Sequence, residues 1–235
     1  MDFKLIYLAR RNPSIRIEDW PRAWRSHAVF ASQFPVIGGR ISSLFYCSRT
    51  ASLPGVPFDP PGLSRDYDGV AVVSSPSAED LGGDMSAEDR ARIDEDELRV
   101  FDALTPTFSF RCEETLVHGG APGSAAVIRF LARKAGGSRE DFLARWGDGH
   151  AAIATRAADA AGTVTRYVHD ELRAPPPPGY PFDGVTETWF ASPEDAARSF
   201  VDAALAPVAQ DLAAFCDLER SVTVLTHVIH RWPRA

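Results

Sequence analysis

The chain has 235 residues, of which 45% are hydrophobic and 24% charged, a balance that can fill one large core or two domains of about 110 residues. The net charge of −7 argues against a nucleic-acid partner, because phosphate binding needs clustered Lys and Arg side chains. The N-terminus lacks a signal-peptide pattern, and no apolar run reaches the ~20 residues of a membrane span. Three widely spaced cysteines, Cys47, Cys112 and Cys216, are expected to be reduced in a cytoplasmic protein.

Residues 1–120 read as strand, helix, strand, strand, helix, strand. Pro21 lies inside the first predicted helix, which tolerates proline only in its first turn. The proline-rich segment Pro54–Pro61 is expected to be a stiff surface loop. An acidic run from Glu88 to Glu97 is expected to form the solvated face of the second helix.

Residues 124–235 repeat this order of elements more regularly. Strands are predicted over 127–133, 163–169, 185–190 and 221–229. Ser138 and Ser192 each precede an acidic residue at the third following position, which predicts a helix start with a capping serine. The second of these helices is expected to run towards Ala214. A second proline-rich loop, Pro175–Pro178, is expected to fold over its own domain.

The two halves share short sequences in the same order, which indicates an internal duplication. The matching segments are Leu8-Ala9-Arg10-Arg11 with Leu131-Ala132-Arg133-Lys134, Glu18-Asp19-Trp20 with Glu140-Asp141-Phe142, Trp24 with Trp146, His27-Ala28 with His150-Ala151, Tyr67-Asp68-Gly69-Val70 with Phe182-Asp183-Gly184-Val185, and Ser77-Ala78-Glu79-Asp80 with Ser192-Pro193-Glu194-Asp195. We therefore predict two α+β domains, 1–120 and 124–235, each with a ferredoxin-like βαββαβ order.

These motifs resemble those of a known family. A strand ending in Arg, the pattern S-x-E-D-F from Ser138, the Arg166-Tyr167 pair and the D-G-V-x-E-x-W-F strand from Asp183 to Phe190 are similar to the EthD-like family of the dimeric α/β-barrel superfamily. In that family, two ferredoxin-like units pack their antiparallel sheets as a barrel, normally by dimerisation. The resemblance therefore implies a pseudo-dimeric barrel within one chain, and it leaves open a homodimer of the whole chain.

The two copies differ at the histidine that follows the shared tryptophan. Trp24 and His27 are separated by two residues, whereas Trp146 and His150 are separated by three. In a regular α-helix this difference would rotate His27 by about 100° relative to Trp24.

The first copy also lacks two polar residues of the second. Val72 stands where the second copy has Glu187, and Phe45 replaces Tyr167 if Leu44-Phe45 aligns with Arg166-Tyr167. We therefore expect the second domain to be the active half and the first to be its structural partner.

Three residues of the second copy are the candidate catalytic residues. His150 lies on an apolar helix face, where it would serve as a general acid or base or, alternatively, as a buried histidine bonded to a carbonyl. Glu187 alternates with apolar residues, so it is either a buried acid or a solvated glutamate on an outward face. Tyr167 would orient a substrate carbonyl or phenol, or it is an ordinary core aromatic.

Candidate substrate-binding residues complete the predicted site. They are the possible pocket walls Trp146 and Trp189, the isolated charge of Arg129, and the histidines His27 and His227. Arg129 would bind an anionic group or pair with Glu187. His227 and His230 do not form a zinc pair, because two residues at this spacing on a strand point to opposite faces. No metal and no cofactor are expected.

We expect cofactor-free acid–base chemistry on a small hydrophobic molecule, aromatic or polyketide-like. Dehydration, decarboxylation, isomerisation or cyclisation would each need only proton transfer by His150 and Glu187. The family resemblance keeps two alternatives open. One is a haem enzyme, because some double-unit relatives bind haem through one histidine. The other is a non-catalytic ligand-binding accessory protein of an oxygenase pathway.

Overall fold

The computed structural model describes residues 2–50, 62–79 and 85–233, so the predicted loop Pro54–Pro61 lies outside the described residues. The first half consists of β1 (Phe3–Ala9), α1 (Trp20–Ala31), α2 (Pro35–Gly38), β2 (Ser43–Arg49), β3 (Gly69–Ser75), α3 (Ala87–Val100), η2 (Thr105–Thr107) and β4 (Ser109–His118). The second half consists of β5 (Ala125–Leu131), α4 (Arg139–Ala144), η3 (Arg145–His150), α5 (Ala151–Ala161), β6 (Val164–Leu172), β7 (Gly184–Phe190), α6 (Pro193–Arg198), α7 (Ala206–Phe215) and β8 (Val222–Trp232).

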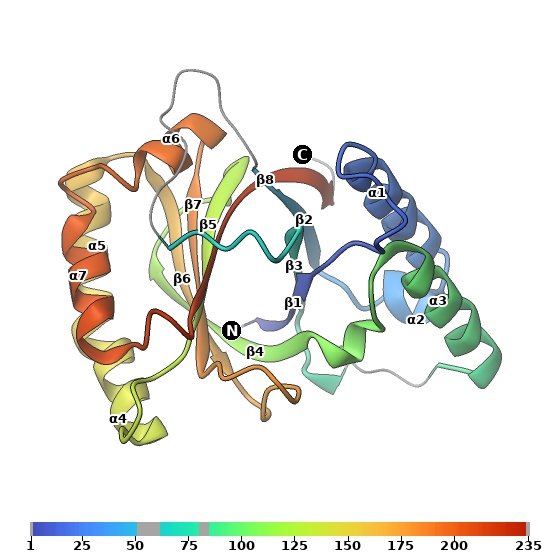
Figure 1. Ribbon diagram of the computed structural model, residues 1–235, viewed down its shortest axis with the longest axis horizontal. Coiled ribbons are helices and arrows are strands. Elements are labelled where there is room, and N and C mark those ends of the chain that lie inside the picture. The colour runs from blue at the N-terminus through green and yellow to red at the C-terminus, as the bar shows by residue number, and fades with distance from the viewer. Residues whose placement is uncertain (1, 51–61, 80–84, 234–235) are drawn as a thin grey trace.

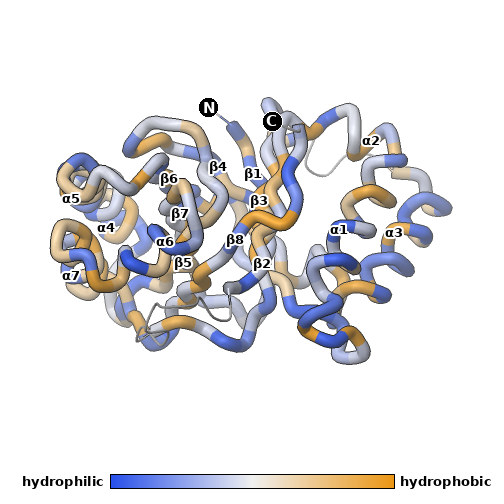
Figure 2. The backbone as a smooth tube through the Cα atoms, turned by 90° about the horizontal axis from the view of Figure 1, so that it is seen from above, coloured by the Kyte–Doolittle hydropathy of each residue, from blue (hydrophilic) through white to orange (hydrophobic). Residues whose placement is uncertain are grey.

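The described strands form one closed antiparallel barrel in the order β1-β3-β2-β8-β5-β7-β6-β4. Each half contributes a four-stranded ferredoxin-like sheet, as the sequence predicts. The sheets join where β2 pairs with β8 and where β4 pairs with β6. The helices of the two halves flank the barrel on opposite sides (Figure 1; Figure 2). The division at residues 120 and 124 stays a prediction, because strands of both halves share one sheet.

Alternation along the strands gives each sheet two faces. One face points into the barrel, where both halves contribute to a shared core that includes Ile6, Val72, Ile128 and Trp189. The other face lies under the helices of its own half, with Tyr7 packed in the first half and Phe190 in the second. The molecule thus has one interior inside the barrel, shared by both halves, and two separate spaces outside it, each between a sheet and the helices of its own half.

Local signals place most helix ends. Ser138 and Ser192 accept hydrogen bonds from the backbone N–H groups of Asp141 (3.0 Å) and Asp195 (3.1 Å), which confirms both predicted caps. Pro21 lies in the first turn of α1, where its missing N–H costs nothing. The helix predicted to reach Ala214 is instead divided into α6 and α7.

A π-helical turn, η3, accommodates the extra residue between Trp146 and His150. Trp24 and Trp146 occupy equivalent positions in the two halves. Trp24 packs against Gly69, the first residue of β3, and Trp146 packs against Gly184, the first residue of β7. A Cβ atom added to either glycine would lie 2.5 Å from the tryptophan ring. The wider turn then brings His150 to face the second helix of its half, as His27 does in a regular helix. The rotation expected from the spacing is therefore absent.

The strand registers correct one predicted correspondence. Leu44 pairs with Val73 in the first half, and Tyr167 pairs with Thr188 at the same distance from the shared glycine in the second half. Leu44, not Phe45, is therefore the counterpart of Tyr167.

All three cysteines are buried and free, and no helix in the described part of the chain is both long and apolar enough to span a bilayer. The Pro175–Pro178 loop of the second half lines a cavity of the first half.

A buried ionic cluster links the two halves inside the barrel. The ammonium of Lys4, on β1, contacts carboxylate oxygens of Glu114 (2.6 Å), Glu187 (2.8 Å) and Asp170 (3.0 Å). Burial opposes the charge of Lys4, but the three carboxyl groups outweigh it and raise the pKa of Lys4. Burial raises the pKa of Asp170, whereas the charge of Lys4 outweighs burial and lowers the pKa of Glu187.

Arg166 brings a second cation to this cluster by pairing with Glu114. Two cations, Lys4 and Arg166, then face the three carboxyl groups. A buried cluster of this kind tolerates the loss of one member poorly, since the remaining charges stay desolvated.

Replacing Lys4 with methionine is expected to lower the free energy of unfolding by about 3–5 kcal/mol, because buried carboxylates then lose their cation. Urea denaturation followed by circular dichroism measures this change. The double variant Lys4→Met/Glu187→Gln should recover part of the loss. Lys134→Met, at the chain's other lysine, is the exposed control; an equal loss there would contradict this account.

Candidate functional site

A large cavity lies in the first half, on the helix-covered face of its sheet. Its volume is about 1530 Å³, and its walls include Tyr7 and Tyr46 from the sheet and His27 from α1. Leu5, Ile41, Leu44 and Val73 contribute apolar surface. Ligand pockets in proteins typically measure about 300–1000 Å³, so this space accommodates a sizeable organic molecule.

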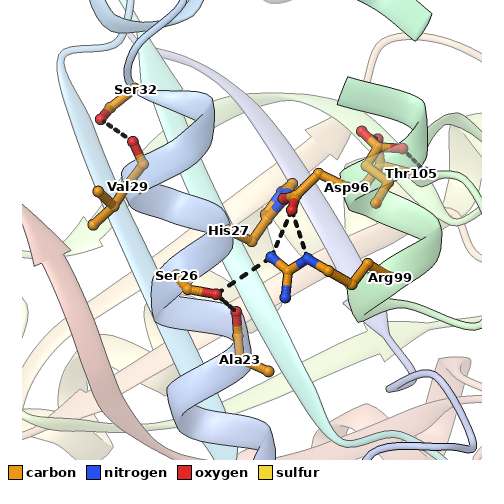
Figure 3. Close-up of polar contacts among 9 residues, drawn as sticks. Ala23, Ser26, His27, Val29, Ser32, Asp96, Arg99 and Thr105 are labelled. Atoms are coloured by element: carbon orange, nitrogen blue, oxygen red, sulfur yellow. Dashed lines mark hydrogen bonds and ion pairs between the residues drawn. The ribbon is translucent and has the colours of Figure 1, made fainter. Parts of the chain in front are cut away.

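His27 and Asp96 form a hydrogen-bonded pair at this cavity. The face of α1 that carries Trp20, Trp24 and His27 packs towards the sheet, while α3 presents Asp96 from the side (Figure 3). The Nδ1 atom of His27 lies 2.7 Å from Oδ2 of Asp96. Arg99 donates from Nε to Oδ1 of the same carboxylate at 2.8 Å.

These contacts fix where the imidazole proton lies. Burial alone would raise the pKa of Asp96, but the hydrogen bonds from His27 and Arg99 outweigh it and lower this pKa. The ionised carboxylate only accepts hydrogen bonds, so Nδ1 of His27 carries the proton. Nε2 has no hydrogen-bond partner among the described residues, and His27 lines the cavity, so this nitrogen is left for a molecule bound there.

Two phenols lie on the sheet side of the same cavity. Tyr7 and Tyr46 are only 4% and 3% exposed. Burial raises the pKa of both hydroxyl groups, so each remains a neutral hydrogen-bond donor at physiological pH. Together with His27, they give the cavity one base and two weak acids.

The second half contains an equivalent histidine–aspartate pair in different surroundings. His150 is fully buried; its Nδ1 lies 2.9 Å from Asp211 of α7 and its Nε2 lies 3.0 Å from the Tyr167 hydroxyl. Burial lowers the pKa of His150, and the hydrogen bond to Asp211 opposes this only in part. The imidazole is therefore neutral, donates from Nδ1 and accepts from Tyr167. Sequence reasoning brought His150 and Tyr167 together correctly, although their catalytic roles stay predictions.

His150 and Glu187 do not share a site. Glu187 points into the barrel with its neighbour Trp189, whose Nε1 donates to Oε2 at 2.6 Å. His150 lies under the helices with Tyr167, on the opposite face of the same sheet. Glu187 is 1% exposed, so it is neither solvated nor open to a ligand, and its partner is Lys4 rather than Arg129.

The remaining predicted residues lie apart from the large cavity, except His27. Trp146 stacks on His169 with ring centroids 4.2 Å apart, which makes it part of the second-half core. Arg129 lies under the helices of the second half beside a cavity of about 80 Å³. His227 is half-buried and its Nδ1 lies 3.1 Å from the Thr50 hydroxyl. Substrate binding by these residues stays a prediction.

Several residues that line the first-half cavity were not predicted from the sequence as site residues. Tyr7 and Tyr46 read as ordinary strand aromatics, and Asp96 lies within the acidic run that was expected to be solvated. Asp96 could have been found from the repeat, because each half places one aspartate near the middle of its second helical region opposite the shared histidine.

His169 gives the second half a pH-dependent stability. Burial, and then the neighbouring His150, lower the pKa of His169 to about 3. Below pH ~6.5, His169 therefore binds a proton in the unfolded chain but stays neutral in the folded protein. Stability attributable to His169 is complete above pH ~6.5 and is lost progressively as the pH falls towards 3.

His169→Phe keeps a ring against Trp146 and removes this titration. Between pH 6.5 and 4, its free energy of unfolding should fall less steeply than that of the wild type, by about 1 kcal/mol per pH unit. Denaturant titrations across this range measure the difference, with the surface substitution His118→Phe as control. Parallel curves for His169→Phe and wild type would show that His169 takes up its proton normally in the folded protein.

The comparisons with known proteins agree with this architecture. The sequence profile of the EthD domain matches residues 134–219. No curated protein matches the sequence. Solved structures similar to the chain include a protein of Fusobacterium nucleatum provisionally assigned as a monooxygenase, with a TM-score of 0.59 and 6% identity over 98% of this chain and 92% of that one.

Two further solved structures have the same fold. An anthrone oxidase-like protein has a TM-score of 0.58 and 14% identity over 98% of this chain and 92% of that one. A protein provisionally assigned as a chlorite dismutase has a TM-score of 0.51 and 12% identity over 97% of this chain and 95% of that one. At these identities the likeness concerns the fold alone. Residues 134–219 are thus similar to the EthD domain, and the chain as a whole has the dimeric α/β-barrel fold of these solved structures.

Proposed function

We propose that the chain binds a small hydrophobic molecule, aromatic or polyketide-like, in the first-half cavity and acts on it by cofactor-free proton transfer. The observation that carries this proposal is the His27–Asp96 pair at the edge of a large, mainly apolar space. The proposal moves the chemistry from the second half, where the sequence led us to expect it, to the half that has room for a substrate.

The arrangement suits chemistry at a carbon next to a carbonyl group. Nε2 of His27 would take a proton from this carbon, and Asp96 would stabilise the resulting imidazolium through Nδ1–H. The neutral phenols of Tyr7 and Tyr46 would donate hydrogen bonds to the enolate oxygen. His27 would then return the proton to another atom. Dehydration, isomerisation and cyclisation all proceed through such an enolate.

The probe 5-nitrobenzisoxazole tests for a base in the cavity without knowledge of the substrate. Removal of its ring C–H proton breaks the N–O bond and releases a coloured nitrophenolate. The wild type is expected to accelerate this reaction with saturation, and His27→Gln should lower kcat/KM by about 100-fold or more, because a positioned general base contributes roughly 10²–10⁴-fold.

The control is His118→Gln, which alters a histidine paired with Asp159 away from the cavity and should leave kcat/KM unchanged. Filling the cavity with Val36→Trp should raise KM, whereas Val201→Trp, at a residue 85% exposed, should not. Equal rates for wild type and His27→Gln would refute the role of His27.

The same observation supports a second candidate, haem binding in the first-half cavity. A haem needs one axial ligand, and Nε2 of His27 is suitably oriented, with Nδ1–H bonded to Asp96 as a supporting contact. The equivalent face of the second-half sheet does not fit, because the cavity beside Tyr167 measures about 80 Å³, far below the ~300 Å³ of small cofactor sites. A bound haem would supply one-electron and oxygen chemistry.

Titration with haemin separates the two candidates. Haem binding predicts a saturable, red-shifted Soret band in the wild type and in His118→Gln, and its loss in His27→Gln. Proton-transfer chemistry without a cofactor predicts no Soret shift above that of the His27→Gln variant.

A further inference from the structure

The helix-covered face of the second half is polar where the same face of the first half is apolar. The registers place Ala9 opposite Gly69 and Leu131 opposite Gly184, so positions can be matched one by one. The matched pairs, first half before second, are Tyr7 and Arg129, Leu44 and Tyr167, Tyr46 and His169, Ala71 and Thr186, and Val73 and Thr188.

Arg129 lacks a counter-ion. No carboxylate in the described part of the chain forms an ion pair or hydrogen bond with its guanidinium, although the side chain lies between the sheet and the helices. Asp211, an acid on the same side, is already paired with Arg145 and His150. Arg129 is only half-buried, but burial still lowers its pKa, so an anion that neutralises its charge would be favoured.

The small cavity beside Arg129 offers one further unsatisfied donor. Thr188 lines it, is 5% exposed, and its hydroxyl has no hydrogen-bond partner. Tyr167 also lines it, but its hydroxyl donates to Nε2 of His150 and is therefore not available to donate to an anion.

The volume restricts what this cavity can hold. About 80 Å³ exceeds the ~10–15 Å³ that one water molecule requires but is roughly half of the ~150 Å³ that accepts benzene. An aromatic substrate does not fit, whereas an anion of three or four heavy atoms does.

We infer that this cavity binds one small oxyanion, of the size of formate, bicarbonate or nitrate, through the Arg129 guanidinium and the Thr188 hydroxyl. Such an anion forms a bidentate ion pair with a guanidinium and accepts a hydrogen bond from a hydroxyl group with its remaining lone pairs. It would neutralise the charge that the protein itself leaves unpaired. This site is separate from the first-half cavity and independent of the function proposed there.

Formate is the probe for this site. Thermal unfolding is followed as formate replaces gluconate, an anion too large for the cavity, at constant ionic strength. The unfolding temperature of the wild type should rise with the logarithm of the formate concentration above the dissociation constant, by about 3 °C or more at ten times that constant. Arg129→Met should abolish the rise, and Thr188→Val should weaken formate binding about tenfold.

Arg156→Met, at an exposed arginine on α5, is the matched control for Arg129→Met and should leave the formate response intact. If Arg129→Met does not fold, the Thr188→Val titration alone decides. Identical responses in wild type and Thr188→Val, or a response that stays linear in formate concentration, would overturn the proposal. A rise with benzoate equal to that with formate would also overturn it, because the site would then take the end of a larger ligand.

Discussion

The structure depends on the pairing of strands across the two halves. Because β4 pairs with β6 and β8 pairs with β2, neither four-stranded sheet has a free edge, and every strand has a fixed inner and outer face. Lys4 joins the halves a second time inside the barrel, where it meets Glu187 and Asp170 of the other half. This closure leaves the two helix-covered faces as the outer faces of the sheets.

On those faces the two halves use one framework for different purposes. Each half brings a histidine from its first helical region to an aspartate of its second, His27 to Asp96 and His150 to Asp211. The histidine of the first half meets a large apolar cavity, while that of the second half meets the Tyr167 hydroxyl. The duplication has therefore kept its hydrogen-bonded pairs and diverged in what surrounds them.

Much of the fold could be predicted because local signals and periodicity agree. The capping serines Ser138 and Ser192 marked helix starts, and the alternation around Glu187 indicated a strand with a buried face. The resemblance to EthD-like proteins supplied the barrel, and the EthD match over residues 134–219 supports it.

The site was harder to predict because it depends on packing between distant segments. The spacing of Trp146 and His150 fits a regular α-helix, so the sequence does not reveal the π-helical turn at Arg145–His150. The rotation predicted for His27 was wrong for this reason. Asp96 is indistinguishable in sequence from its solvated neighbours until α1 is known to lie against it. Which half is hollow is decided by side-chain volumes across several strands, and no local pattern reports that quantity.

In our proposal the ligand lies against the helix-covered sheet face of the first half, whereas the same face of the second half leaves only a small cavity. Crystals soaked with 4-bromophenol test it directly, since the anomalous signal of bromine locates an aromatic ligand without knowledge of the natural one. We predict a bromine peak between α1 and the first-half sheet, within contact of His27 and Tyr46. A peak only under α5 and α7 of the second half, or none in the first-half cavity, would contradict the account.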